Sequence, residues 1–345
     1  MRILHIMNDR HRAGTEEAFM THCRIGKKHG DSIFAMVTKQ CQYKKELKDL
    51  DVPFSVMPKR RFWNLTFKRT IQEMVAQYHP DIILLHGSGP SRLFRKIPLN
   101  VPTLVITHTY NVKQMLQYDG IIALTEDLKL AVCKVGALPH NVFVVPNMFI
   151  KPPITHMTQP FSLNPIPIIG ALGRFRDIKG FDILIDAMAI LKKRNVPCKA
   201  VIAGDGKDEQ TLQKHIVGHG LENIVALKEW VSGEAKEAFY NSIDILCVPS
   251  RSEPFGLVTL EGFAYQRPVI ATHTQGPKEI ITPHETGLLF EKENPENLAN
   301  CIEALCHDHQ KAIILGQKGE ASLTRYHPDT IWPQLKQVFE SFIKH

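Results

Sequence analysis

The stretch PSRSEPFGLVTLE, residues 249–261, follows directly on an apolar run at residues 243–248. A short apolar run that ends in turn-forming residues is typical of a buried parallel strand. Pro254 stands where the first turn of a following helix is expected, because proline is favoured at that position. The stretch therefore predicts a strand–loop–helix unit. The residues expected to present unpaired N–H groups at the helix start are Phe255, Gly256, Leu257 and Val258.

Short apolar runs alternate with stretches of helical period on both sides of this unit. Strands are expected in the first half at 2–7, 32–37, 82–86, 103–107, 120–124 and 142–145. They are expected in the second half at 167–172, 199–203, 224–227, 243–248, 269–272 and 287–290. Intervening helices are expected at 15–29, 64–78, 127–135, 181–194 and 297–305. This pattern predicts an α/β protein with two Rossmann-like doubly wound parallel sheets.

The chain has 345 residues, more than the roughly 250–300 that one hydrophobic core supports. Residues 147–167 contain five prolines and no helical period, which indicates a linker. We therefore expect one domain over residues 1–155 and a second over residues 156–329. Because ligands bind at the carboxyl ends of parallel strands, the cleft between the two domains is the expected site.

A second polar loop, GRFRDIKG at residues 173–180, follows the strand expected at 167–172. Arg174 and Lys179 would converge there on the start of a helix, an arrangement that binds a diphosphate without a metal. A basic loop with a capping role is an equal alternative. Gly14 and the sequence GDG at 204–206 also follow expected strands, and each is either a tight turn or part of an anion site.

Two glutamates, Glu253 and Glu261, are eight residues apart. On one helix this spacing gives about 12 Å, too far for two carboxylates that flank one glycosidic bond. The pair would suit the two hydroxyl-bearing ends of a long ligand, with a phosphate between them at the helix start. The alternative is that both are solvated surface residues.

Together these motifs resemble glycosyltransferase family 4, the group 1 glycosyl transferases. The resemblance rests on EPFGxxxxE after a strand and GRFxxxKG about 75 residues earlier, with IAGDG at 202–206 and QGPKE at 275–279 between and after them. It implies a GT-B fold and a retaining enzyme that uses a nucleotide-diphosphate sugar, with UDP the expected nucleotide. It implies no cofactor.

The resemblance also implies roles for individual residues. Arg174 and Lys179 would neutralise the donor diphosphate, and Glu253 would bind donor-sugar hydroxyls. Backbone N–H groups of residues 255–258 would assist at sugar and phosphate, Glu261 would hold the ribose, and Gly14 would let a loop of the first domain close on the phosphate. His108, after the strand at 103–107, would lie against the donor sugar; the alternative is a capped strand-end histidine.

A family pattern also places the final helix across the interdomain junction. Residues 330–344 carry an apolar stripe at helical spacing, and we expect this helix to pack back on the first, acceptor-side domain. The stripe comprises Ile331, Trp332, Leu335, Val338, Phe339 and Phe342.

The sequence departs from the family pattern at a few turns. Ala13 and Gln275 replace glycines, Met148 follows Pro146-Asn147, and the segment 229–231 lacks a glycine near the expected nucleobase site. These changes bear on loop conformation and base preference. Because an Asp-x-Asp occurs only at residues 49–51, in a basic stretch, we expect no divalent metal in the reaction.

Charge is distributed unevenly along the chain. Residues 1–160 hold 22 Lys and Arg against 12 Asp and Glu, whereas residues 161–345 hold 20 against 23. A basic segment interleaved with aromatics is typical of a helix on an anionic membrane, although a solvated helix whose aromatics pack on the domain fits as well. Its central residues are Lys59, Arg60, Arg61, Phe62 and Trp63.

Composition excludes several other classes of protein. The chain is 22% charged and 43% hydrophobic, ordinary for a globular protein, and no apolar run reaches the roughly 18 residues of a spanning helix. We expect no nucleic acid partner because no motif for one occurs. Seven cysteines without a CxxC pair indicate reduced thiols in a cytoplasmic protein.

The sequence thus predicts a hexosyltransferase, peripheral on the inner face of the cytoplasmic membrane. Its expected acceptor is lipid-linked or of the lipopolysaccharide or surface-polysaccharide type. Two alternatives stay open: transfer to a soluble acceptor such as a sugar phosphate or protein, and a non-catalytic nucleotide-sugar-binding subunit.

Overall fold

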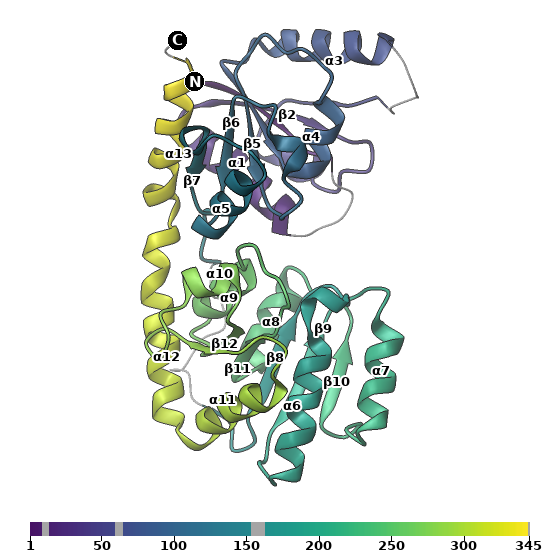
Figure 1. The fold of residues 1–345 in the computed structure, drawn as a ribbon, viewed down its shortest axis with the longest axis vertical. Helices are drawn as coiled ribbons and strands as arrows, with labels where there is room; N and C mark the ends of the chain where they lie inside the picture. The colour runs from purple at the N-terminus through teal and green to yellow at the C-terminus, as the bar shows by residue number, and fades with distance from the viewer. Residues whose placement is uncertain (9–13, 59–64, 153–162, 344–345) are drawn as a thin grey trace. The chain divides into compact units, whose positions relative to one another are not determined.

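The computed structural model describes residues 1–8, 14–58, 65–152 and 163–343. It divides into two compact units: Met1–Ile150 with Arg325–His345, and Lys151–Thr324. Each unit contains a parallel sheet with helices around it (Figure 1). The two Rossmann-like parallel-sheet domains predicted from the sequence are confirmed.

The first unit holds a seven-stranded sheet in the order β3-β2-β1-β4-β5-β6-β7. Its elements are β1 (Arg2–Ile6), α1 (Gly14–Lys28), β2 (Ser32–Val37), α2 (Lys44–Asp49), β3 (Phe54–Val56), α3 (Leu65–Tyr78), β4 (Ile82–His86), α4 (Ser88–Phe94), β5 (Thr103–Thr107), η1 (Lys113–Met115), β6 (Gly120–Ala123), α5 (Glu126–Lys134), η2 (Pro139–Asn141) and β7 (Val142–Val144). The short edge strand β3 is not among the expected strands. Its three residues are too few to show an alternating pattern.

The second unit holds a six-stranded sheet in the order β10-β9-β8-β11-β12-β13. Its elements are β8 (Ile168–Leu172), η3 (Asp177–Lys179), α6 (Phe181–Lys193), β9 (Lys199–Ala203), α7 (Glu209–Gly218), β10 (Val225–Lys228), α8 (Glu234–Ser242), β11 (Ile245–Val248), α9 (Leu257–Ala264), β12 (Val269–Thr272), α10 (Gln275–Ile280), β13 (Leu288–Phe290), α11 (Pro295–His307) and α12 (His309–Ser322). A short helix η4 (Leu323–Tyr326) leads into α13 (Pro328–Ile343).

In the second unit, alternate residues of the strands face two different helix layers. Ile245 and Cys247 of β11 pack in the core that α6 and α11 line, whereas Leu246 packs against Gly262 of α9. Such near-continuous apolar strands are expected of a parallel sheet that is buried on both faces. In each sheet the first strand lies between two later ones, so each has a switch point at its carboxyl edge.

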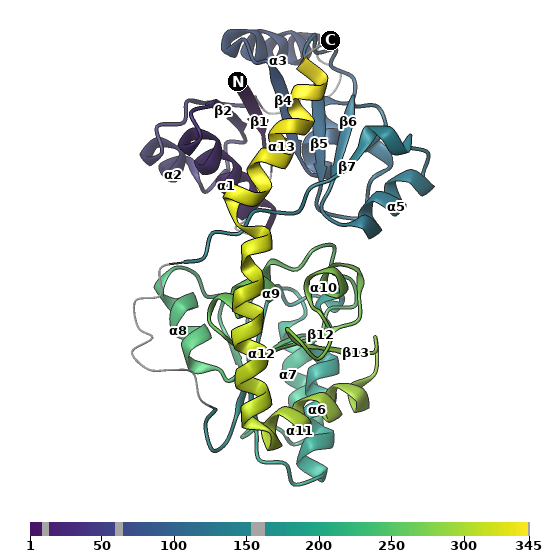
Figure 2. The ribbon, with the colours of Figure 1, turned by 90° about the vertical axis from the view of Figure 1, so that its left-hand side faces the viewer.

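The helix α13 packs in the first unit, where it lies beside α1 and along the sheet (Figure 2). Trp332 is buried against Gly26 of α1, and Phe342 reaches Gly120 of β6 and Phe143 of β7. Since Gly26 and Gly120 have no side chains, both aromatic rings approach the backbone closely. The apolar stripe of α13 is covered within this unit.

Candidate functional site

Four loops meet at the carboxyl edge of the second sheet, after β8, β9, β11 and β12. A Cβ atom on Gly204 would lie 1.9 Å from the carbonyl oxygen of Gly173, and one on Gly180 would lie 2.0 Å from that of Pro249. The amide of Gly276 donates to the carbonyl oxygen of Glu253 at 2.8 Å. These backbone contacts require glycine and hold the polar residues of the loops together.

The loop after β8 carries the two predicted cations. The ammonium of Lys179 lies 2.6 Å from Oε2 of Glu253, and the two side chains are 25% and 14% exposed. A guanidinium nitrogen of Arg174 lies 3.4 Å from Oδ1 of Asp205, and the group lies over the Trp230 ring, 5.4 Å from its centroid. The structure thus brings Arg174, Lys179 and Glu253 to one edge, where each cation has a carboxylate partner.

The helix after β11 begins later than the sequence predicts. Its first residue is Leu257, and Gly256 precedes it with φ of +105°. The expectation of Pro254 in the first turn is therefore wrong, because Gly256 in the left-handed region separates it from the helix. Leu257 and Val258 supply the first helical amides, which lack acceptors within the helix, whereas Phe255 lies before the helix with its side chain buried.

Glu261 lies on α9 and is held by two donors. Lys236 and Tyr240 donate to its two carboxylate oxygens, each at 2.7 Å. Burial and the neighbouring carboxylate raise the pKa of Tyr240 well above its usual value. Because Glu253 precedes the helix, the spacing of about 12 Å expected for a single helix does not apply to this pair.

Arg251 is a site residue that the sequence analysis did not single out. It makes two hydrogen bonds of 2.8 and 2.6 Å with the carboxylate of Asp182 and an ion pair of 2.8 Å with Glu293. Burial alone would raise the pKa of Asp182, but the hydrogen bonds and charge of Arg251 outweigh it and lower that pKa. Since Asp182 is 69 residues away, only the fold reveals that Arg251 fixes the start of α6.

At the carboxyl edge of the first sheet, His108 follows β5 and Gly14 is the first residue of α1. Gly87 lies between them: a Cβ there would be 3.8 Å from both the His108 ring and the Thr15 methyl. Among described residues the Nε2 atom of His108 has no hydrogen-bond partner, and burial lowers the pKa of this histidine to about 4. His108 is therefore a neutral imidazole at neutral pH.

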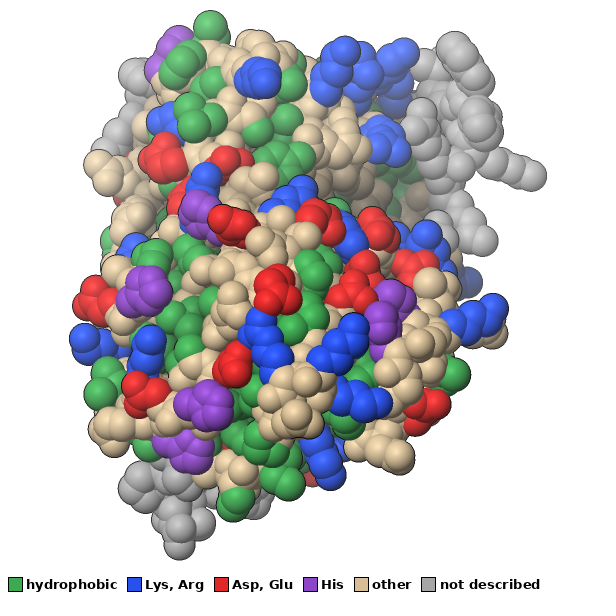
Figure 3. All heavy atoms as spheres, turned by 60° about the horizontal axis from the view of Figure 1, so that its bottom comes forward, with side chains coloured by type: hydrophobic (Ala, Val, Ile, Leu, Met, Phe, Trp, Pro, Cys, Tyr) green, Lys and Arg blue, Asp and Glu red, His purple; other side chains and the backbone are tan. Residues whose placement is uncertain are grey.

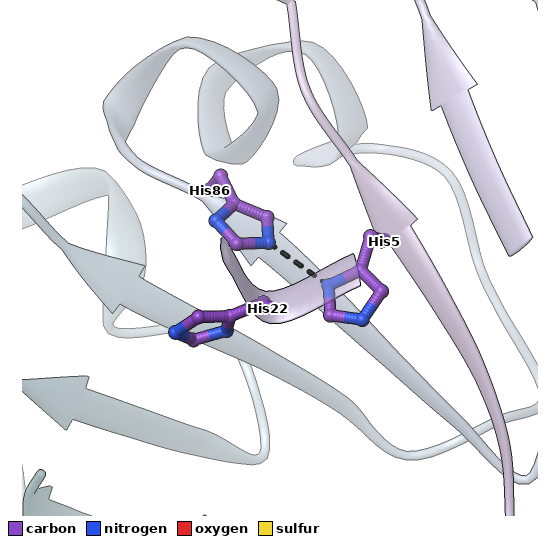
Figure 4. A group of neighbouring side chains, drawn as sticks. All are labelled: His5, His22 and His86. Carbon is purple, nitrogen blue, oxygen red and sulfur yellow. Dashed lines mark hydrogen bonds between the residues drawn. The ribbon is translucent and has the colours of Figure 1, made fainter. Parts of the chain in front are cut away.

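Behind His108 lies a cluster of buried histidines, His5 on β1, His22 on α1 and His86 on β4 (Figure 4). Nδ1 of His5 and Nε2 of His86 are 3.0 Å apart, and the His86 ring stacks on His108 at 6.2 Å. Burial lowers the pKa of His5 to about 3, and burial with the neighbouring histidines lowers those of His22 and His86. No sequence motif predicts this cluster, because its members are distant in the chain.

The predicted membrane-binding residues Lys59, Arg60, Arg61, Phe62 and Trp63 lie outside the described residues. The helix α3 begins directly after them at Leu65. Within the described part of the chain, no helix combines the length and apolarity needed to cross a bilayer.

Residues 159–322 match the family model of glycosyl transferases group 1. An uncharacterized glycosyltransferase of Methanocaldococcus jannaschii is 33% identical over 169 residues, 49% of this chain and 46% of that protein. A lipopolysaccharide core biosynthesis glycosyltransferase of Rhizobium meliloti is 29% identical over 157 residues, 46% of this chain and 44% of that protein. These matches span less than half of the length of either relative.

Among solved structures, Anabaena HepE in complex with UDP and glucose superposes with a TM-score of 0.85. That match has 21% sequence identity and covers 99% of this chain and 100% of the other. It confirms the GT-B fold class. The family resemblance of the motifs is confirmed as well, because the family model covers both GRFxxxKG at 173–180 and EPFGxxxxE at 253–261. The second unit is a domain of the group 1 glycosyl transferases.

Proposed function

We propose that this protein transfers a hexose from a nucleotide-diphosphate sugar, with UDP as the nucleotide, to a lipid-linked or lipopolysaccharide-type acceptor at the cytoplasmic membrane face. The observation that carries the proposal is the edge of the second sheet. There Lys179 pairs with Glu253, Arg174 lies in the same loop as Lys179 and pairs with Asp205, and α9 begins at Leu257, just after the loop that carries Glu253. Cations and helix-start amides at one place bind a diphosphate.

The ion pair between Lys179 and Glu253 links a diphosphate-binding group to a sugar-binding group. The Glu253 carboxylate lies 2.6 Å from the Lys179 ammonium. A bound diphosphate competes for the ammonium, which leaves the Glu253 carboxylate available to accept hydrogen bonds from sugar hydroxyls. Glu261, held by Lys236 and Tyr240, is positioned to accept from the ribose hydroxyls.

Bond cleavage at C1 builds negative charge on the leaving diphosphate. Arg174, Lys179 and the amides of Leu257 and Val258 stabilise that charge in fixed positions, and each such donor is worth about 3 kcal/mol in the transition state. We propose that the acceptor hydroxyl attacks C1 from the face of the leaving group, with retention, and that its proton passes to an oxygen of the departing diphosphate. Protein cations supply the charge compensation, so the reaction proceeds without a divalent metal.

We assign the first unit to the acceptor. His108 follows β5 at the carboxyl edge of its sheet, and a neutral imidazole offers a hydrogen bond to a sugar hydroxyl without adding charge. The Rhizobium relative, described as acting in lipopolysaccharide core biosynthesis, supports a surface-polysaccharide acceptor. The basic segment containing Lys59, Arg60 and Arg61 supports docking on anionic lipid.

The proposal is tested by thermal shift with a panel of UDP-, GDP- and ADP-sugars, followed by hydrolysis and transfer assays in excess EDTA. A donor that binds only the folded state raises the melting temperature. We expect a rise with one UDP-sugar and unchanged turnover in EDTA. A panel without any shift contradicts donor binding, and activity that returns only with Mn²⁺ or Mg²⁺ contradicts the metal-independent mechanism.

A further inference from the structure

A second group of potential ligands lies in the second unit, on helices rather than on the loops described above. Asp186 lies on α6, while His215 on α7 and His219 just after it face the same carboxylate. Nε2 of His215 is 2.7 Å and Nε2 of His219 is 3.1 Å from the one oxygen Oδ1 of Asp186. Three ligand atoms therefore converge on one point.

The helix provides this convergence. Residues four apart lie on the same helix face, and the two imidazole rings of His215 and His219 lie 4.9 Å apart. All three side chains are 35–37% exposed, so a dissolved ion can reach them. The surface in Figure 3 shows histidine side chains next to acidic ones.

We propose that Asp186, His215 and His219 bind a zinc-type divalent cation. Two imidazole nitrogens and a carboxylate oxygen, with a water as the fourth ligand, make a tetrahedral zinc site. Bonds of about 2.0–2.2 Å place neighbouring ligand atoms roughly 3.3 Å apart. The exposed rings reach this spacing by moving a few tenths of an ångström from their present 2.7 and 3.1 Å.

The buried cluster of His5, His22 and His86 is a weaker candidate for the same ion. Its ligands are three neutral imidazoles without a carboxylate, in a core where the rings are at most 4% exposed. The double positive charge of a divalent cation would be largely uncompensated there, which costs several kcal/mol. At the surface site, the Asp186 carboxylate neutralises part of the charge and water solvates the rest.

The cation would clamp α6 to α7. These helices flank the loop that carries Arg174 and Lys179: α6 begins just after that loop, and Asp208, directly before α7, accepts a hydrogen bond of 2.7 Å from the amide of Asp177. A bound ion would therefore stabilise the second unit and leave the donor groups unchanged. This inference does not rest on the proposed sugar transfer.

The experiment uses the full chain, stripped with EDTA and dialysed, and follows Zn²⁺ binding by thermal shift and Co²⁺ binding by visible absorption. We expect Zn²⁺ well above its dissociation constant to raise the melting temperature by about 5 °C. Co²⁺ should give the intense absorption of a tetrahedral site, and Mg²⁺ should do nothing, because it prefers oxygen ligands.

Asp186→Asn and His219→Gln should abolish both signals, and His307→Gln, at an exposed histidine beside Glu303 in the same unit, should keep them. Retained thermal shift in both site variants, lost signal in His307→Gln, or no Zn²⁺ effect on wild type would each overturn the proposal. If a variant fails to fold, the Co²⁺ spectrum of the wild type decides: octahedral, weak absorption rejects the site. Binding of UDP by the site variants at wild-type strength separates this outcome from failure of the proposed donor site.

Discussion

The carboxyl edges of the two sheets hold their polar groups in opposite ways. In the second unit, Lys179 and Glu253 form a charged pair that remains partly exposed. In the first unit, His5 and His86 are fully buried, and their pKa values are lowered by burial. The same topology thus supports a partly exposed ion pair in one domain and buried, neutral imidazoles in the other. The difference leads to two predictions. Acid should destabilise the first unit, whereas removal of a charged side chain should impair the second.

Acid should have the largest effect, and it should act on the first unit. A base whose folded pKa lies below its unfolded value of 6.5 binds fewer protons when folded, so stability is complete above about pH 6.5 and is lost as pH falls toward about 3 for His5 and about 4 for His108. The loss amounts to several kcal/mol. Urea unfolding at about pH 7.5 and about pH 5 measures this loss of stability. Unfolding of the first unit is monitored by the fluorescence of Trp332 in a Trp63→Phe/Trp230→Phe variant, in which Trp332 is the one remaining tryptophan.

A variant sharpens this test. His86→Gln should reduce the pH-dependent part of the unfolding free energy, whereas His140→Gln, at an exposed position, should leave it unchanged. Equal stability of the wild-type first unit at the two pH values would contradict the neutral-edge interpretation.

Removal of a cation of the proposed donor site should have the next largest effect, on turnover. Arg174→Ala or Lys179→Ala should lower turnover by ~10²–10³, the scale of one preorganised group that stabilises developing charge. Steady-state assays with the donor identified by thermal shift measure this. Arg194→Ala is the matched control, because Arg194 is also an ion-paired cation of the second unit, bound to Glu303. Turnover within threefold of wild type in both site variants would contradict the assignment of Arg174 and Lys179 to the leaving diphosphate.

A smaller effect is expected on stability when the loop contact at Gly180 is changed. Gly180 has φ of +65°, and a Cβ there would lie 2.0 Å from the Pro249 oxygen, so Gly180→Ala should cost at least about 2 kcal/mol. Gly218→Ala meets nothing within 4 Å and should be neutral or stabilising by up to about 1 kcal/mol. Urea denaturation compares them, and equal stability of the two variants speaks against the close approach of these loops.

Membrane docking of the first unit is the smallest effect per residue, about 1 kcal/mol for each Lys or Arg near an anionic surface. Wild type should co-sediment with phosphatidylglycerol vesicles at low salt and dissociate as salt rises, because screening acts within about 8 Å at physiological salt. Lys59/Arg60/Arg61→Ser should lose binding, and Lys192/Lys193/Lys214→Ser, which removes as many cations from the second unit, should retain it. Equal sedimentation of both variants would point to a soluble, phosphorylated acceptor for these cations.

The sequence by itself determined the two α/β domains and the motifs around Arg174 and Glu253. Strands such as β8 and β9 are predicted by local apolar runs, and turns are predicted by the glycines in the loops. Both kinds of pattern are contained in short stretches of sequence. The start of α9 was mispredicted, because the left-handed conformation of Gly256 outweighs the preference of Pro254 for a first turn.

Only the tertiary structure decided which distant groups share a partner. Lys179 and Glu253 are 74 residues apart, and Asp186 meets His215 across 29. No local sequence pattern predicts either contact, because each depends on how whole strands and helices pack against one another. The buried histidines show the same limit: in the sequence His5 and His86 are ordinary polar residues, and burial in the packed core alone makes them neutral.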